Sequence, residues 1–168
     1  MPRPSSKIIA AICTTALLFM ASGCARFSRQ SELECMERVV YFESNRSSRD
    51  GLIAVGSVVM NRVASPQFPN TVCAVVGQKN QFARGVLTRD MNASGLPKAR
   101  EAARAVLRGE RHPLIGNAMF FHQAGLSFPY DNMHYVLVAG GNAFYEKRKA
   151  QFVTQPVQPQ PIEGLTGL

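Results

Sequence analysis

Apolar residues recur at helical spacing in three segments of the chain. Over 33–43 they fall at every third or fourth position, and Ser31 followed by Glu34 matches a helix capping box. Residues 51–64 are apolar on almost every side, which predicts a helix at the centre of the core. A third helix is expected over 97–107, because a proline stands in its first turn and a glycine follows its end.

Shorter elements surround these helices. A short helix is expected to end at Val76, and residues 77–96 are polar, contain glycines and show no periodicity. Short strands are expected at 118–122, 134–139 and 142–145. Helix remains an alternative for these brief runs. The pattern predicts an α+β fold that is mainly helical, with a small β-hairpin or sheet.

The N-terminus has the features of an export signal. Basic residues precede an apolar run at 8–21, which is shorter than the roughly 18–20 residues that a membrane-spanning helix needs. Small residues then precede Cys24, as in a bacterial lipobox. We therefore expect residues 1–23 to be a lipoprotein signal peptide and Cys24 to carry the lipid. An ordinary cleavage site and a permanent transmembrane anchor are the alternatives.

The 168 residues of the chain leave room for one domain after such processing. We expect a tether at 24–30, the domain at 31–151, and a disordered tail at 152–168 because that segment is rich in Pro and Gln. Since no Asp follows Cys24, attachment to the outer membrane facing the periplasm is the expected location.

Cys35 and Cys73 are the two cysteines left within the expected domain. In an exported protein they are expected to form a disulfide, with two buried free thiols as the alternative. A zinc site is not expected, because neither cysteine belongs to a Cys-x2-Cys pair and His112, His122 and His134 lack the spacing of metal ligands. We expect no metal and no cofactor.

The net charge of +8 indicates attraction to an anionic partner. The basic stretch 84–111 lacks interleaved aromatic residues, so nucleic acid is not an expected partner, and binding of anionic lipid by this stretch is an alternative. The row formed by Arg100, Arg104 and Arg108 is most simply a solvated helix face.

Glu43 is a charged residue in a position where partial burial is expected. It follows the apolar run 39–42 at the end of the first expected helix. Partial burial there would disfavour the charged form and raise the pKa of the carboxyl group, as a general acid near neutral pH requires. From periodicity alone, a glutamate that points to solvent is the alternative.

Several blocks of the sequence match a known pattern. They are Tyr41-Phe42-Glu43, Asp50-Gly51 with Asn61-Arg62-Val63, 65–76 with Gln81-Phe82, and 118–122 with 141–145. On these blocks, residues 35–145 resemble the cell wall hydrolases of the spore-cortex-lytic (SleB/CwlJ) type. The chain departs from the family pattern where Ser44-Asn45 replaces Ala-Arg and where Leu52 replaces Gln.

The resemblance implies a lysozyme-like domain that cleaves peptidoglycan glycan strands between N-acetylmuramic acid and N-acetylglucosamine, with Glu43 as the catalytic acid and base. Candidates for contacting the substrate are Tyr41, Asn61, Gln81, Phe82, His122 and Tyr145. For each of them a structural role is the alternative.

The small number of acidic residues near Glu43 in the sequence favours one type of cleavage. A lytic transglycosylase needs one carboxyl group, because the nucleophile is the C6 hydroxyl of the substrate itself. A hydrolase normally needs two, and Asp50, the next acid after Glu43 in the sequence, is most simply a helix-start residue. Lytic transglycosylation is therefore expected, with a hydrolase of glucosaminidase or muramidase type, or a weakly active or inactive peptidoglycan-binding lipoprotein, as alternatives.

Overall fold

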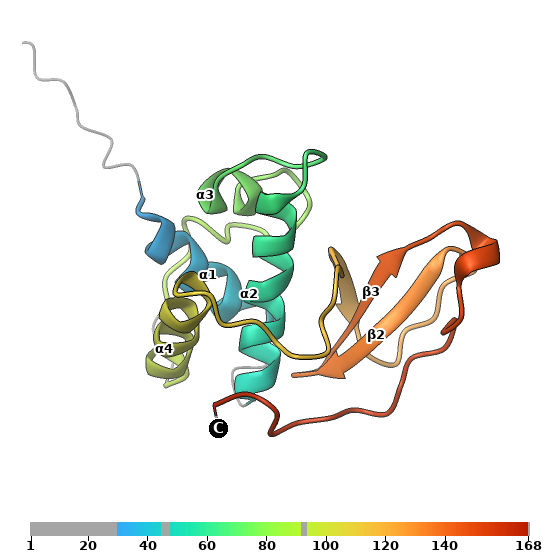
Figure 1. Cartoon of the computed structure of the whole chain (residues 1–168). Helices are drawn as coiled ribbons and strands as arrows, with labels where there is room; N and C mark the ends of the chain where they lie inside the picture. Colours follow the sequence, from blue (N-terminus) through green and yellow to red (C-terminus); the bar gives the residue numbers. More distant parts are fainter. Residues whose placement is uncertain (1–29, 45–47, 92–93, 168) are drawn as a thin grey trace, which may run out of the picture.

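The computed structural model describes residues 30–44, 48–91 and 94–167. The helices gather on one side of the molecule and the sheet lies on the other (Figure 1). The elements in chain order are α1 (Glu32–Glu43), α2 (Arg49–Ala64), α3 (Val72–Val76), α4 (Leu96–Leu107), β1 (Phe120–Gln123), β2 (Met133–Ala139), β3 (Asn142–Lys147) and the 3₁₀ turn η1 (Ala150–Phe152). The predicted signal peptide, Cys24 and all but the last residue of the expected tether lie outside the described residues.

Side-chain caps fix the starts of three helices. The hydroxyl of Ser31 accepts a hydrogen bond from the backbone N–H of Glu34 at 3.1 Å, as the capping box predicted. Helix α2 begins two residues earlier than expected, because the Ser48 hydroxyl accepts the N–H of Gly51 at 3.0 Å. Thr71 caps α3 in the same way.

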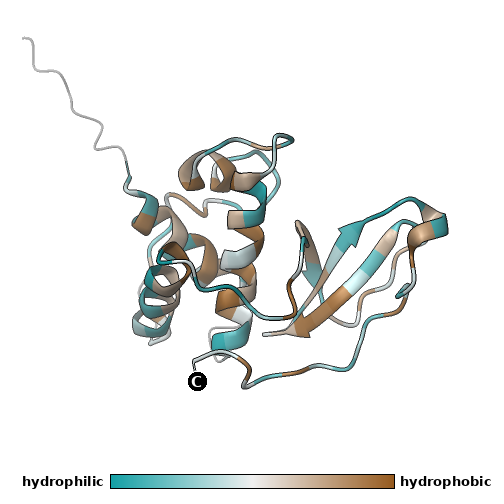
Figure 2. Cartoon of the chain, in the orientation of Figure 1, coloured by the Kyte–Doolittle hydropathy of each residue, from teal (hydrophilic) through white to brown (hydrophobic). Residues whose placement is uncertain are grey.

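Helix α2 is central, as its all-round apolar sequence predicted. It packs against α1, α3 and α4, and the residues from Leu52 to Val59 are buried. Figure 2 shows hydrophobic residues along this helix. None of the helices in the described part of the chain is long and apolar enough to cross a membrane. A disulfide between Cys35 and Cys73 joins α1 to α3 over a separation of 38 residues, which confirms the predicted pairing.

The sheet is antiparallel, with strand order β1-β3-β2. Gly140 and Gly141 form the tight turn between β2 and β3 with φ values of 57° and 80°, which glycine adopts without strain. This turn also touches α2, since a Cβ added to Gly51 would lie 2.5 Å from the Cα of Gly140. The sheet is therefore anchored at one end against the start of the central helix.

The segment expected to be a disordered tail is instead bound to the domain. We call residues 153–167 the C-terminal strap, which runs back from the far end of the sheet to the base of α2 (Figure 1). Its carbonyl of Gln155 accepts the N–H of Tyr135 at 2.9 Å, and the N–H of Ile162 donates to Val138 at 3.0 Å. The prediction of disorder was wrong because it rested on the small number of apolar residues in this segment. The strap is held instead by hydrogen bonds to β2 and α2, which composition does not show.

Candidate active site

Glu43 ends α1 at the junction between the helices and the sheet. One carboxylate oxygen accepts a hydrogen bond from the backbone N–H of Ala83, and the Glu43 carbonyl accepts one from the Asn142 side-chain amide at 2.7 Å. Burial raises the pKa of the Glu43 carboxyl group, while the Ala83 N–H and the positive charges of Arg62 and Arg89 oppose this rise. The side chain is half-buried, so its carboxyl group combines partial desolvation with access to solvent.

Arg62 is the buried cation beside Glu43. Its side chain comes from α2, is 3% exposed, and donates from Nε to the carbonyl of Met119 at 2.8 Å. The guanidinium lies among phenyl rings, with Cζ 5.1 Å from the centroid of Phe68, 5.0 Å from Phe82 and 5.8 Å from Phe120. Burial lowers the pKa of Arg62 to about 10, and Nη1 has no hydrogen-bond partner among the described residues. The protein thus keeps a desolvated positive charge close to the Glu43 carboxylate.

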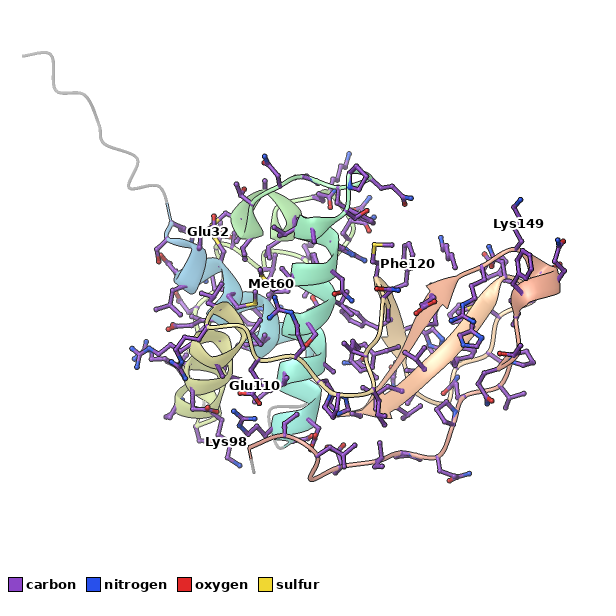
Figure 3. All side chains as sticks on the ribbon, in the orientation of Figure 1. Glu32, Met60, Lys98, Glu110, Phe120 and Lys149 are labelled. Carbon is purple, nitrogen blue, oxygen red and sulfur yellow. A yellow bond between two sulfur atoms is a disulfide. The ribbon has the colours of Figure 1, made fainter. Side chains whose placement is uncertain are left out.

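Aromatic side chains continue from this cation toward the sheet. Phe82 packs on Phe121 at 6.3 Å between centroids, and Phe120 stacks on Tyr145 at 5.6 Å. Figure 3 shows Phe120 on β1, on the side of the sheet that faces α2. The positive charge of Arg62 acts on Tyr145 as well as on Glu43. Glu43, Arg62, Phe82 and Tyr145 therefore form one neighbourhood, which we call the Glu43 site.

Of the other predicted substrate contacts, three are engaged within the fold and one is exposed to solvent. Tyr41 is 3% exposed in the hydrophobic core, and Asn61 donates to the carbonyls of Gly116 and Ala118 at 3.0 and 2.9 Å. His122 shares a 2.8 Å hydrogen bond between Nε2 and the hydroxyl of Tyr135. Gln81 is exposed in the loop between α3 and α4.

The loop between α3 and α4 lies beside Glu43, because its residue Ala83 donates the hydrogen bond to the Glu43 carboxylate. Residues between Val76 and Thr88, among them Phe82 and Ala83 but not Gln81, line a hollow of about 500 Å³. The irregular sequence of the loop predicted that it forms no helix or strand. The backbone N–H of Ala83 is therefore not used in a helix or strand and donates to Glu43 instead.

Asp50 points away from the Glu43 site. Its carboxylate accepts the backbone N–H groups of Gly164 and Leu165 in the strap, and His112 Nε2 lies 3.2 Å from Oδ1. The carboxyl group is therefore used in holding the strap as well as in starting α2. Nowhere in the described ranges do three His, Cys, Asp or Glu side chains gather in a group that could hold a metal ion.

The sequence pattern did not identify Arg62 and Arg89 as parts of the site. Arg62 stood within the Asn61-Arg62-Val63 block, and its position inside an otherwise apolar helix was the available signal. Arg89 gave no comparable signal, since its approach to Glu43 depends on the course of the irregular loop, where its guanidinium lies 4.0 Å from the ring centroid of Phe42.

The chain matches a known protein family. The sequence profile described as Cell Wall Hydrolase matches residues 46–145, so Glu43 lies three residues before the matched range. The spore cortex-lytic enzyme of Oceanobacillus iheyensis is 32% identical over 95 residues, which is 55% of this chain and 32% of that protein. The Bacillus cereus enzyme of the same name is 40% identical over 53 residues, 32% of this chain and 20% of that protein. The chain thus spans a third or less of the length of these curated relatives.

Solved structures are similar over most of the described fold. The catalytic domain of the germination-specific lytic transglycosylase SleB from Bacillus anthracis superposes with a TM-score of 0.57 and 27% identity, covering 72% of this chain and 98% of that one. The catalytic domain of the Bacillus cereus SleB protein gives a TM-score of 0.58 and 25% identity, covering 71% and 94%. The helices with a small antiparallel sheet thus form the fold of these catalytic domains, as the resemblance implied.

Proposed function

This chain belongs to the cell wall hydrolase family, and we propose that it is a peptidoglycan lytic transglycosylase in which Glu43 is the only catalytic carboxyl group. The observation that carries this proposal is the environment of Glu43. Its carboxyl group is half-buried, has a raised pKa and receives one backbone N–H, so it can hold a proton and then carry the resulting charge.

The reaction needs two proton transfers by the same group. Protonated Glu43 donates to the glycosidic oxygen as the bond from C1 of N-acetylmuramic acid breaks, and N-acetylglucosamine leaves with a free hydroxyl group. The Glu43 carboxylate then removes the proton from the C6 hydroxyl, whose oxygen bonds to C1 and closes the 1,6-anhydro ring. Glu43 ends protonated and ready for the next cycle.

The surroundings of Glu43 favour a mechanism with one catalytic carboxyl group over a hydrolytic mechanism with two. Within the described part of the chain, the charged side chains that act on its carboxyl group are Arg62 and Arg89, both of them cations. A glycoside hydrolase normally places a second carboxyl group about 5–10 Å away, either as nucleophile or as the base for a water molecule. Asp50, the candidate for that role, is bound to Gly164 and Leu165 of the strap.

The buried guanidinium and the aromatic side chains have separate roles in this proposal. Arg62 stabilises the carboxylate that forms after Glu43 gives up its proton, in a site where burial weakens solvent screening. Phe82, Tyr145 and the exposed Gln81 are the proposed contacts to the sugar rings and N-acetyl groups. Tyr41, Asn61 and His122 support the fold through the contacts described above.

Peptidoglycan as substrate implies that the protein is exported. We propose that residues 1–23 direct this export and that Cys24 carries lipid that holds the protein in the outer membrane facing the periplasm. Replacement of Cys24 by Ser is expected to move the protein from the membrane to the soluble fraction of lysed cells. Unchanged membrane association of the variant would contradict the lipid anchor.

The chemical nature of the product tests the proposed reaction. The purified protein is incubated with purified peptidoglycan, and the soluble fragments are analysed by mass spectrometry. Fragments that end in 1,6-anhydro-N-acetylmuramic acid are expected. Reducing ends would instead indicate hydrolysis, and intact glycan that co-sediments with the protein would indicate a binding protein.

A further inference from the structure

A second hollow lies at the end of the sheet, next to the Glu43 site. Its volume is about 340 Å³, at the lower end of the roughly 300–1,000 Å³ range of small-molecule pockets. The loop before β2 contributes Tyr130 and Asn132, β2 contributes Met133, and β3 contributes Tyr145 and Lys147. We call this cavity the sheet pocket.

The sheet pocket is bordered by exposed aromatic rings that the fold holds in place. Tyr130 is 65% exposed and Phe128 is 42% exposed, and their rings are stacked with an angle of 9° and a centroid distance of 6.1 Å. Phe128 packs edge-on against His122 at 4.8 Å, and His122 is in turn bonded to Tyr135. Two fixed aromatic rings facing solvent offer a stacking surface for an apolar sugar face.

The sheet pocket shares the side chain of Tyr145 with the Glu43 site. Tyr145 lines the pocket and stacks on Phe120, whose ring centroid is 5.8 Å from the guanidinium carbon of Arg62. Arg62 acts electrostatically on both Tyr145 and Glu43. A chain of sugars whose cleaved bond lies at Glu43 can therefore continue along Tyr145 toward Tyr130.

Lys147 adds a positive charge to the wall of the sheet pocket. Its ammonium nitrogen lies 4.5 Å from the ring centroid of Phe120, and no carboxylate in the described part of the chain forms an ion pair with it. Asn132, in the loop before β2, adds a side-chain amide to the lining of the same pocket. An acidic ligand group would find a free cation there.

We propose that the sheet pocket binds a sugar of the peptidoglycan strand that neighbours the cleaved bond, with its ring on Tyr130 and an acidic stem-peptide carboxylate at Lys147. This inference rests on the proposed function and extends it, because it assigns recognition of the peptide-bearing strand to residues outside the Glu43 site. The same pocket would bind a neutral N-acetylglucosamine oligomer through Tyr130 alone.

Binding by the full chain carrying Glu43→Gln tests this proposal without turnover. Isothermal titration calorimetry compares a soluble glycan fragment that carries stem peptides with an N-acetylglucosamine oligomer of equal length. Tyr130→Ala is expected to weaken binding of both ligands about tenfold. Lys147→Gln is expected to weaken binding of the peptide-bearing ligand several-fold and to leave the neutral one unchanged.

Two matched variants control for general loss of charge or aromatic surface. Lys149 lies at the far end of the sheet (Figure 3) and Phe152 is 58% exposed, and neither lines the sheet pocket. Lys149→Gln and Phe152→Ala are expected to bind both ligands like the parent, and circular dichroism verifies the fold of every variant.

The outcomes separate this inference from the proposed function. Unchanged affinity of Tyr130→Ala, equal losses in Lys147→Gln and Lys149→Gln, or no measurable binding by the parent would each overturn the sheet pocket as a glycan site. Cleavage of peptidoglycan by the wild-type protein is measured in parallel, and its absence would overturn the proposed function whatever the binding result.

Discussion

At the residue scale, the carboxyl group of Glu43 is subject to opposing influences. Burial raises its pKa, and the charges of Arg62 and Arg89 together with the Ala83 N–H lower it. Protonated Glu43 starts the proposed reaction, so activity should fall as the pH rises through this pKa. The pH at which activity falls therefore measures the net effect of burial and of the two arginines on the pKa of Glu43.

Removal of either positive charge is expected to move this fall in activity to higher pH. Without a nearby cation the ionised form of Glu43 is less stable, so the carboxyl group keeps its proton to higher pH. Arg62→Gln should give the larger shift because Arg62 is buried, whereas Arg89 is exposed and screened by solvent. The measurement is the rate of peptidoglycan solubilisation against pH for the two variants and the wild type.

Equal shifts in the two variants, or a shift to lower pH, would contradict this electrostatic role of Arg62. Thermal unfolding is the control, because Arg62 also packs among phenyl rings and its loss can weaken the fold.

At the element scale, the caps and apolar periodicity were sufficient to predict the helices and the central position of α2. They did not predict the contacts between segments that lie far apart in the chain. Ser31 and Thr71 mark helix starts by local hydrogen bonds that depend on a few neighbouring residues. The approach of Ala83 to Glu43 and that of Asn142 to the same residue join segments 40 and 99 positions apart. Such contacts depend on the tertiary fold, so Arg89 could not be predicted from the sequence. Glu43 became a candidate through its place in the Tyr41-Phe42-Glu43 block of the resemblance, because periodicity alone left a solvent-exposed glutamate open.

The disulfide is the covalent link between two of these elements. Cys35 on α1 and Cys73 on α3 close a loop with a separation of 38 residues. By restricting the unfolded chain, such a cross-link is expected to stabilise the folded state by roughly 3–4 kcal/mol. Reduction, or the Cys35→Ser/Cys73→Ser double variant, is expected to lower the free energy of unfolding by about that amount in urea titrations. An unaltered unfolding curve would mean that the two cysteines do not pair in the purified protein.

At the scale of the whole molecule, the C-terminal strap connects the two sides of the fold. It bonds to β2 through Gln155 and Ile162, and to the base of α2 through the Asp50 carboxylate. Glu163 adds contacts to Ser48 and to the Gly140 N–H. The strap therefore bridges the helices and the sheet, between which Glu43 lies.

Asp50→Asn is expected to destabilise the protein by about 1–3 kcal/mol, because the amide cannot accept the strap N–H groups as the carboxylate does. Deletion of residues 163–168 removes the same contacts, so the two changes should not be additive in a double-mutant cycle of urea unfolding. Asp131→Asn is the matched control, since Asp131 is exposed on the loop before β2.

Additive effects of Asp50→Asn and the deletion would show that the Asp50 carboxylate does not hold the strap. That result would also free Asp50 for another role and weaken the argument for a single catalytic carboxyl group.

The most direct test of the central claim is the rate at which Glu43→Gln cleaves peptidoglycan, measured by release of soluble fragments. Because the amide cannot give or take the proton, we expect a loss of at least about a hundredfold. Since burial raises the pKa of Glu43, its ionised form costs stability at pH 7, so the variant should unfold at the same temperature as the wild type or higher. Glu101→Gln, on the surface of α4, should keep full activity. Cleavage by Glu43→Gln at the wild-type rate would contradict the account.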